Sequence, residues 1–201
     1  MPRFLFALFF IVMPVQAMSK SNIVVLGDSI SAGYGLEVGQ GWVSLVQKKL
    51  EAQKGCCEIF NESISGDTSA GGLAKIDRII SQHKPKVLVL ELGANDGLQG
   101  LPIKNLKSNL AEIIKRAQNA KAKVLLLSMR IPPNYGKRYV DMFYNVYPEL
   151  AKEFAIPFIP FIMEDVALVK DLMQPDGLHP NIKAQPLIAD KVWQRLKPFL
   201  K

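Results

Sequence analysis

From residue 23 onward, short apolar runs alternate with longer amphipathic stretches. Three of the runs are wholly apolar and lack the alternation of a half-exposed strand, which is typical of strands covered on both faces. A fourth run is weaker, and a fifth is flanked by prolines, which favours a position at the edge of a sheet. In chain order, the predicted strands are 23–26, 58–61, 87–90, 124–127 and 157–161.

Between these runs, apolar residues recur three and four positions apart, which is the spacing of one buried helix face. Two prolines bear on the predicted helices. Pro148 lies inside one of them and is expected to kink or split it, whereas Pro186 is tolerable in the first turn of another. The predicted helices cover residues 42–50, 73–80, 106–117, 139–154 and 184–196.

Strands that alternate with helices predict βαβ units and a mostly parallel sheet. The chain has 201 residues, 49% of them hydrophobic, which is enough for one domain with its own core and too few for two of ordinary size. We therefore expect a single α/β domain, a doubly wound sheet of about five parallel strands with helices on both faces. In such a sheet, ligands bind beyond the carboxyl ends of the strands.

The first 17 residues have the pattern of a secretory signal peptide. Arg3 supplies a short positive region, residues 4–15 are almost wholly apolar, and Ala17 is a small residue suited to a signal peptidase. An uncleaved N-terminal anchor is the alternative, although the apolar run is short for a membrane span, which needs roughly 20 residues. We predict a cleaved leader at 1–17, a mature domain at 18–201 and a periplasmic or secreted location.

The net charge of +7 comes from lysines spread over the predicted helices, with no basic block interleaved with aromatic residues. This is typical of a solvated surface, so no nucleic-acid partner is predicted, although a mild positive field would attract anionic lipid or acyl substrates. The only cysteines, Cys56 and Cys57, are adjacent, and a disulfide between neighbours is strained. With two histidines in the chain there is no metal-binding spacing, and we expect neither a metal nor another cofactor.

A serine near one end of the chain and a histidine near the other indicate nucleophilic catalysis. Ser29 follows the first predicted strand directly, at a turn that exposes its hydroxyl. A serine nucleophile needs an imidazole to take its proton, and the chain offers His83 and His179. Only His179 has a carboxylate three residues upstream, Asp176, which can orient the imidazole ring and stabilise the imidazolium.

Acyl transfer also needs hydrogen-bond donors for a developing oxyanion. The candidates are the backbone amide of Ser29, the amide of Gly66, which no side chain shields, and the carboxamide of Asn95. All three residues come soon after predicted strands. Each residue also has an ordinary alternative: a helix cap for Ser29, a turn glycine for Gly66, an Asx-turn for Asn95 and a loop histidine bound by backbone for His179.

Two common motifs are absent from the chain. It contains no Gly-x-Ser-x-Gly nucleophile elbow, so it does not have the pattern of a standard α/β-hydrolase. It contains no Gly-x-x-x-x-Gly-Lys-Ser/Thr phosphate-binding loop either. The segments that carry Ser29, Gly66 and Asn95 therefore match neither of these motifs.

Four blocks of the chain resemble, in order, those of the SGNH or GDSL-type hydrolase family. Further stretches at 130–136 and 147–154 are similar to the bacterial acyl-CoA thioesterase I / protease I / lysophospholipase (arylesterase) group, so the resemblance covers nearly all of the mature chain. Cys56 and Cys57 are no part of that pattern. The serine, glycine, asparagine and histidine blocks are residues 27–35, 61–68, 91–97 and 176–181.

The resemblance implies a flavodoxin-like sheet and hydrolysis of thioesters, aryl esters and lysophospholipids without a cofactor. The partner would be a small acyl ester or thioester, with at most peripheral contact with a membrane. In this scheme Ser29 is the nucleophile, His179 the general acid and base, and Asp176 the residue that orients it. The Ser29 amide joins Gly66 and Asn95 in the oxyanion hole.

The resemblance also implies a mobile loop beside the site, around residues 97–101. Leu98, Ile131 and Tyr135 are expected to line the acyl groove, with ordinary packing as an equal alternative. Asp28 is expected to brace the turn before Ser29 rather than to act chemically.

Three other functions remain open from the sequence. The same four blocks serve carbohydrate-ester deacetylases, which would prefer acetyl esters. A flavodoxin-like module that binds a small acyl or nucleotide ligand without turnover is an alternative from a different class. Acyl transfer to an acceptor other than water is a further option.

Overall fold

The computed structural model describes residues 21–53 and 57–200. Its centre is a five-stranded sheet in the order β2-β1-β3-β4-β5, in which every neighbouring pair is parallel. The predicted doubly wound fold is confirmed, and the predicted leader at 1–17 lies outside the described residues. The strands are β1 (Ser21–Gly27), β2 (Cys57–Asn61), β3 (Val87–Glu91), β4 (Lys123–Leu127) and β5 (Phe158–Ile159).

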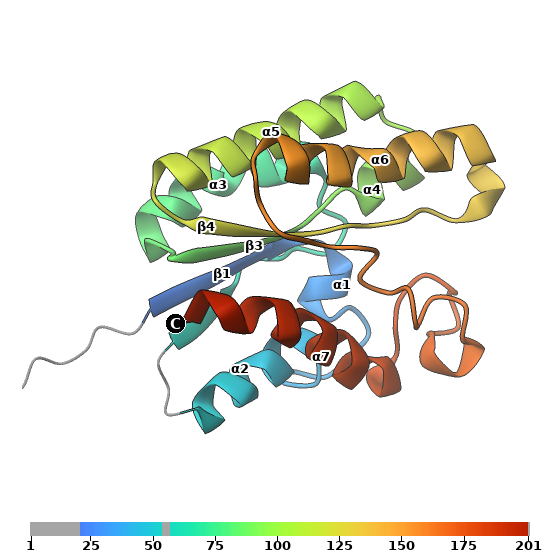
Figure 1. The fold of residues 1–201 in the computed structure, drawn as a ribbon. Helices are drawn as coiled ribbons and strands as arrows, with labels where there is room; N and C mark the ends of the chain where they lie inside the picture. Colours follow the sequence, from blue (N-terminus) through green and yellow to red (C-terminus); the bar gives the residue numbers. More distant parts are fainter. Residues whose placement is uncertain (1–20, 54–56, 201) are drawn as a thin grey trace, which may run out of the picture.

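Helices cover both faces of the sheet (Figure 1). One layer contains α2 (Trp42–Ala52) and α7 (Gln185–Leu196), which pack against each other. The other contains α3 (Ser69–His83), α5 (Ile103–Asn119) and α6 (Lys137–Glu153). The remaining elements are the short helices α1 (Ser29–Ala32) and α4 (Ala94–Leu98) and the 3₁₀ turns η1 (Pro133–Tyr135), η2 (Lys170–Leu172), η3 (Ile182–Ala184) and η4 (Lys197–Leu200).

The structure differs from the predicted elements in three places. The helix around Pro148 is neither split nor ended there, because the buried side chains Phe143, Tyr147 and Leu150 hold α6 against the sheet and outweigh one missing backbone hydrogen bond. The proline-flanked strand is shorter than predicted, although its place at the edge is confirmed. The helices α1 and α4 were not predicted, because each is too short to show a hydrophobic period.

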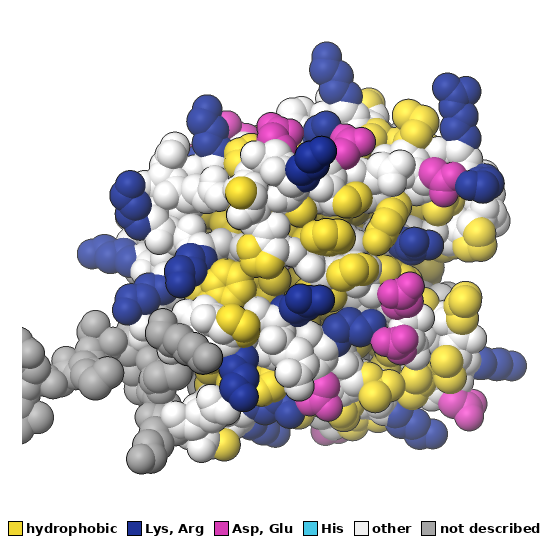
Figure 2. All heavy atoms as spheres, viewed as in Figure 1, with side chains coloured by type: hydrophobic (Ala, Val, Ile, Leu, Met, Phe, Trp, Pro, Cys, Tyr) yellow, Lys and Arg dark blue, Asp and Glu magenta, His cyan; other side chains and the backbone are white. Residues whose placement is uncertain are grey.

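Charged side chains are spread over the helical surface. Figure 2 shows Lys and Arg side chains distributed across one face with Asp and Glu among them. Several lysines pair with acids of neighbouring elements, such as Lys49 with Asp190 and Lys107 with Glu149. This arrangement fits a solvated surface and indicates no nucleic-acid site. Among the described residues, no helix combines the length and the apolar character that crossing a membrane requires.

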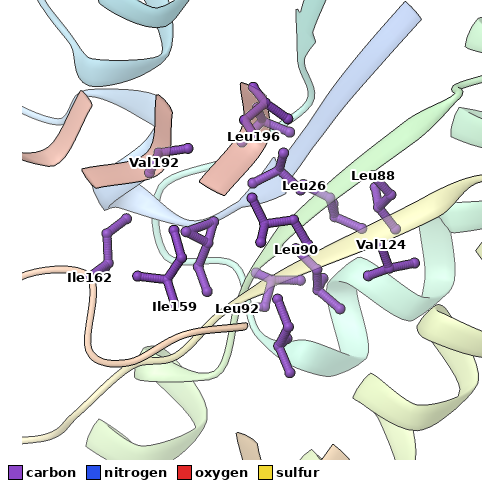
Figure 3. Close-up of a cluster of buried hydrophobic side chains, with 14 of the residues drawn as sticks. Leu26, Leu88, Leu90, Leu92, Val124, Ile159, Ile162, Val192 and Leu196 are labelled. Carbon is purple, nitrogen blue, oxygen red and sulfur yellow. The ribbon is translucent and has the colours of Figure 1, made fainter. Parts of the chain in front are cut away.

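The core lies on both faces of the central strands. Leu26, Leu88 and Leu90 have no exposed surface and share one face of the sheet, where Leu26 lies close to Gly72 of α3. Figure 3 shows them together with Val192 and Leu196, which α7 contributes from the opposite layer. Burying a leucine side chain stabilises the fold by roughly 1.5–3 kcal/mol. Because the strands are parallel, this packing also fixes all their carboxyl ends at one edge of the sheet, where the connections to the helices begin.

Candidate functional site

Ser29 stands at the junction of β1 and α1. Asp28 caps the helix, with its Oδ1 accepting a hydrogen bond of 3.1 Å from the amide of Ile30. This confirms that Asp28 braces the turn. Because Asp28 takes the capping role, the side chain of Ser29 is left for another partner, and its Oγ lies 2.8 Å from Nε2 of His179.

His179 and Asp176 lie in one turn before α7. Nδ1 of His179 is 2.7 Å from Oδ2 of Asp176, and Oδ1 of Asp176 accepts hydrogen bonds from the amides of Leu178 (2.9 Å) and His179 (3.0 Å). Slight desolvation raises the pKa of Asp176, but hydrogen bonds from the ring and amide of His179 and from the amide of Leu178 outweigh it and lower the pKa to about 2. Asp176 is therefore a carboxylate at all ordinary pH values.

Two residues that the sequence analysis did not single out hold this histidine against the serine. The ring of Tyr34 lies on that of His179, with 4.5 Å between centroids. Gln174 donates from its carboxamide to the carbonyl groups of Tyr34 (2.7 Å) and Pro180 (3.1 Å), and its amide donates to the carbonyl of His179 (2.8 Å). The loops that carry Ser29 and His179 are thus tied together. Tyr34 belongs to the serine block, but Gln174 carries no signal in the sequence.

His83, the other histidine, belongs to a separate cluster. It ends α3, is 7% exposed, and places Nε2 2.7 Å from Oε1 of Glu62 and its ring 4.4 Å from that of Phe60. Burial raises the pKa of Glu62, but hydrogen bonds from His83 and Arg78 outweigh burial and lower it. Of the two histidines, only His179 contacts a serine hydroxyl.

The candidate oxyanion donors lie on the neighbouring loops. Asn95 is in α4, and its Nδ2 donates to the carbonyl of Asp67 at 2.8 Å, while its contact with Oδ2 of Asp28 is long, at 3.5 Å. Its side chain therefore bridges two loops and does not form an Asx-turn. Gly66 directly precedes Asp67, is exposed and has φ +83°, at the third position of a turn closed from the Asp67 amide to the Ile64 carbonyl.

The three predicted lining residues lie at α4: Leu98 ends this helix, and Ile131 and Tyr135 contact it. Tyr135 donates from its hydroxyl to the carbonyl of Leu98 at 3.0 Å and is 39% exposed, and Leu98 is half-buried. Ile131 is 4% exposed and packs against Gly97, which is ordinary core packing and leaves little of its side chain to line a groove. Of the three, only Tyr135 lines a hollow of about 490 Å³, together with Gly136, Lys137, Arg138, Tyr139 and Met142.

Two carboxyl groups are buried close to the turn that carries Ser29. Burial raises the pKa of Asp28 to about 6, against the lowering effect of the Ile30 amide, and burial raises the pKa of Glu91 well above its ordinary value. Glu91 was not predicted as a site residue. Its signal in the sequence is a charged residue that ends an otherwise wholly apolar strand. Among the described residues, no group of three or more His, Cys, Asp or Glu side chains is arranged to hold a metal ion.

The chain is similar to several known proteins. Residues 25–185 match the model of the GDSL-like Lipase/Acylhydrolase family. The chain is 45% identical to the esterase TesA of Pseudomonas aeruginosa over 94% of each chain. It is 41% identical to the thioesterase 1/protease 1/lysophospholipase L1 of Escherichia coli, over 96% of this chain and 91% of that one. The crystal structure of the psychrotrophic esterase EstA from Pseudoalteromonas sp., inhibited by monoethylphosphonate, has a TM-score of 0.86 and 43% identity over 90% of this chain and 99% of that one.

Replacing Asp28 by asparagine is expected to change how stability depends on pH. Burial raises the pKa of Asp28 from 3.8 to about 6, so between these values the folded protein holds a proton that the unfolded chain releases. The free energy of unfolding of the wild type therefore falls as the pH rises through this window, by on the order of 3 kcal/mol for this group. Asp28→Asn keeps a capping side chain and lacks this fall.

Urea denaturation at several pH values measures the effect. A constant offset from the substitution displaces the difference in unfolding free energy equally at every pH, so the slope of that difference against pH reports Asp28 alone. Asp165→Asn, at an exposed position, is the control and is expected to follow the wild type. Parallel curves for the wild type and Asp28→Asn between about pH 4 and about pH 6 contradict the prediction.

Proposed function

The chain belongs to the GDSL-like lipase/acylhydrolase family, and we propose that it hydrolyses carboxylic esters and thioesters through an acyl-enzyme on Ser29. One observation carries this proposal: Oγ of Ser29, the imidazole of His179 and the carboxylate of Asp176 form a continuous chain of hydrogen bonds, 2.8 and 2.7 Å long. Such a chain is what an activated serine nucleophile requires. The similarity to proteins named esterase and thioesterase supports the two classes of bond.

In the first half of the reaction, Nε2 of His179 takes the hydroxyl proton as Oγ of Ser29 bonds to the acyl carbon. The carboxylate of Asp176 holds Nδ1 protonated and stabilises the imidazolium that forms. His179 then returns the proton to the leaving alcohol or thiol as its bond to the acyl carbon breaks. In the second half, His179 takes a proton from water as the water oxygen bonds to the acyl carbon. It then returns the proton to Oγ of Ser29 as the bond between Oγ and the acyl carbon breaks, which releases the acid and restores the serine.

The oxyanion that forms in both halves is negative and needs donors. We assign this role to the amides of Ser29 and Gly66 and to the carboxamide of Asn95. Nδ2 of Asn95 has two hydrogens, and one is committed to the carbonyl of Asp67. The other makes only the long contact with Asp28, so it is available to the oxyanion without the loss of a good hydrogen bond.

The acyl chain is proposed to pass along α4. Leu98 and Tyr135 offer surface there, and Tyr135 also lines the hollow that includes Tyr139 and Met142 as well as the cationic Lys137 and Arg138. Lysophospholipids fit this proposal as single-chain esters, and contact with a membrane would be peripheral.

Substitution of each histidine in turn is expected to show which of the two is the general base. His179→Asn removes the general base and lowers kcat roughly 10⁴–10⁶-fold, and Ser29→Ala does the same. His83→Asn is the matched control. It breaks the contact with Glu62, which is not part of the triad, so kcat is expected to stay nearly unchanged in the folded protein. Rates on p-nitrophenyl esters from acetyl to palmitoyl, and on acyl thioesters, give the measurement.

Melting curves first establish that each variant is folded. Equal losses in His179→Asn and His83→Asn would contradict the assignment. A folded wild type that hydrolyses none of these substrates would favour a binding module instead. A strict preference for acetyl esters would favour the deacetylase alternative.

Removal of the Asn95 carboxamide is expected to slow the chemical step. Asn95→Ala lowers kcat by roughly 10²–10³-fold with little change in KM, because the donor acts on charge that develops only in the transition state. Asn105→Ala, an exposed asparagine near the start of α5, is the matched control and retains full kcat. A change confined to KM would assign Asn95 to substrate binding.

We also propose that the protein is exported, on the pattern of residues 1–17. Expression of the full chain in a Gram-negative host is expected to yield a periplasmic protein that begins at Met18, as measured by mass spectrometry of the periplasmic fraction. Ala17→Arg places a large charged residue at the cleavage site and is expected to leave the leader attached. An intact wild-type chain in the membrane fraction would support the anchor alternative.

A further inference from the structure

Glu91 is a buried carboxyl group to which the proposed reaction gives no role. It ends β3, has no exposed surface, and is the register partner of Gly27, two residues before the nucleophile. Within the described part of the chain, no Lys, Arg or His side chain forms an ion pair with it. An unpaired negative charge at such a buried position would cost folding free energy, so the protonation state of Glu91 matters for the stability of the site.

The contacts of Glu91 lie on both sides of Ser29. Its Oε2 accepts a hydrogen bond of 2.6 Å from the hydroxyl of Ser31 and a longer one of 3.3 Å from the amide of Asp28. A Cβ at position 27 would lie 2.5 Å from the same oxygen, so the carboxyl group is pressed against Gly27. Glu91 therefore holds the three residues that define the turn around the nucleophile.

Only one of the two carboxyl oxygens of Glu91 has donors. None of the described residues donates a hydrogen bond to Oε1, which is fully buried. The buried carboxyl group of Asp96 differs, since its two oxygens accept from the amide (2.8 Å) and hydroxyl (2.5 Å) of Ser69. A buried acceptor without a donor costs about 1–3 kcal/mol, whereas a protonated Oε1 is itself a donor and Asp28 supplies the adjacent acceptor.

We propose that Glu91 is a positioning residue that stays protonated at neutral pH, and that its carboxylic acid, bound to Ser31 and Asp28, holds the turn that presents Ser29. The effect on turnover rests on the proposed hydrolase function, whereas the protonation does not. Glu91 does not touch the reacting atoms and acts through the backbone and side chains of the turn.

The surrounding charges favour this state. Burial and the neighbouring charge of Asp28 raise the pKa of Glu91, and the hydrogen bonds from Ser31 and the Asp28 amide oppose them without prevailing. Asp28, whose pKa is about 6, is the member of the pair that ionises first. The other titratable groups that face the pair are Tyr147 of α6, Asp67 after β2, and His179, whose charge favours ionised Asp28.

One proton on the pair leaves a single negative charge beside the nucleophile. That charge contacts the Asn95 carboxamide and favours the imidazolium that His179 becomes during the reaction. Loss of the second proton would place two carboxylates in contact in a buried site and break the hydrogen bond between them. The protonated acid thus supplies rigidity without adding charge.

Infrared difference spectroscopy tests the protonation directly. At about pH 8, where Asp28 is ionised, the wild type minus Glu91→Gln spectrum is expected to contain the carbonyl stretch of a protonated carboxylic acid. Glu62→Gln is the matched control, because hydrogen bonds from His83 and Arg78 outweigh burial and lower the pKa of Glu62. Its difference spectrum is expected to show only carboxylate bands. Carboxylate bands alone for Glu91 would overturn the proposal.

Kinetics test the positioning role. In Glu91→Gln, the carboxamide oxygen can accept from Ser31 and from the Asp28 amide, and the NH₂ group can donate to the Asp28 carboxylate. This variant is therefore expected to keep kcat within about threefold of the wild type. Glu91→Leu fills the space without hydrogen bonds and is expected to lower kcat tenfold or more with KM unchanged, because Ser29 is no longer held in place. A folded Glu91→Leu enzyme with full kcat would overturn the positioning role.

The melting temperature supplies a readout that needs no activity. The wild type loses stability relative to Glu91→Gln as the pH rises above about 4.5, because the folded state must keep a proton that the unfolded chain gives up. The difference in melting temperature is therefore expected to grow with pH. A difference in melting temperature that stays constant with pH would overturn the proposal that Glu91 is protonated. A wild type without turnover would refute the hydrolase function, but the spectroscopic and thermal results would remain valid.

Discussion

The site depends on one constraint: β1 and β3 are neighbours in a parallel sheet that is buried on both faces. Their register places Gly27 opposite Glu91, so the turn that carries Ser29 and the strand end that braces it meet at the same edge. Burial of the strands makes this edge rigid, since a slip of one residue would turn every apolar side chain to the other face. The loops of the site are therefore anchored on the buried centre of the sheet.

Three carboxyl groups serve this site in three different environments. Asp176 is partly exposed and bound to His179 and two amides, and its pKa is lowered to about 2. Asp28 is buried beside a hydrogen-bonded helix end, and burial raises its pKa to about 6. Glu91 is buried completely, and its pKa is raised well above the ordinary value. Solvent exposure and local donors, rather than residue type, assign one group to orient the histidine and the other two to hold the turn.

Much of the fold follows from the sequence, and so does the choice of candidate reactive residues. Wholly apolar runs separated by amphipathic stretches are enough to predict a parallel sheet covered on both faces, because only buried strands tolerate such runs. Ser29 after the first strand, and an aspartate three residues before His179, are local patterns with a direct chemical meaning. The course of α6 through Pro148 was not predictable, because the packing of Phe143 and Tyr147 against the sheet decides it.

What only the tertiary structure decided concerns contacts between distant residues. His83 and His179 have different surroundings, because one meets Glu62 and the other meets Ser29, 150 positions away. Gln174 joins the serine and histidine loops, and Glu91 meets Ser31 across 60 positions, yet neither belongs to a local pattern that names its partner. The sequence by itself determined the kinds of element and the reactive groups, since both depend on neighbours along the chain. Burial and long-range pairing, which set protonation and position, exist only once the sheet has formed.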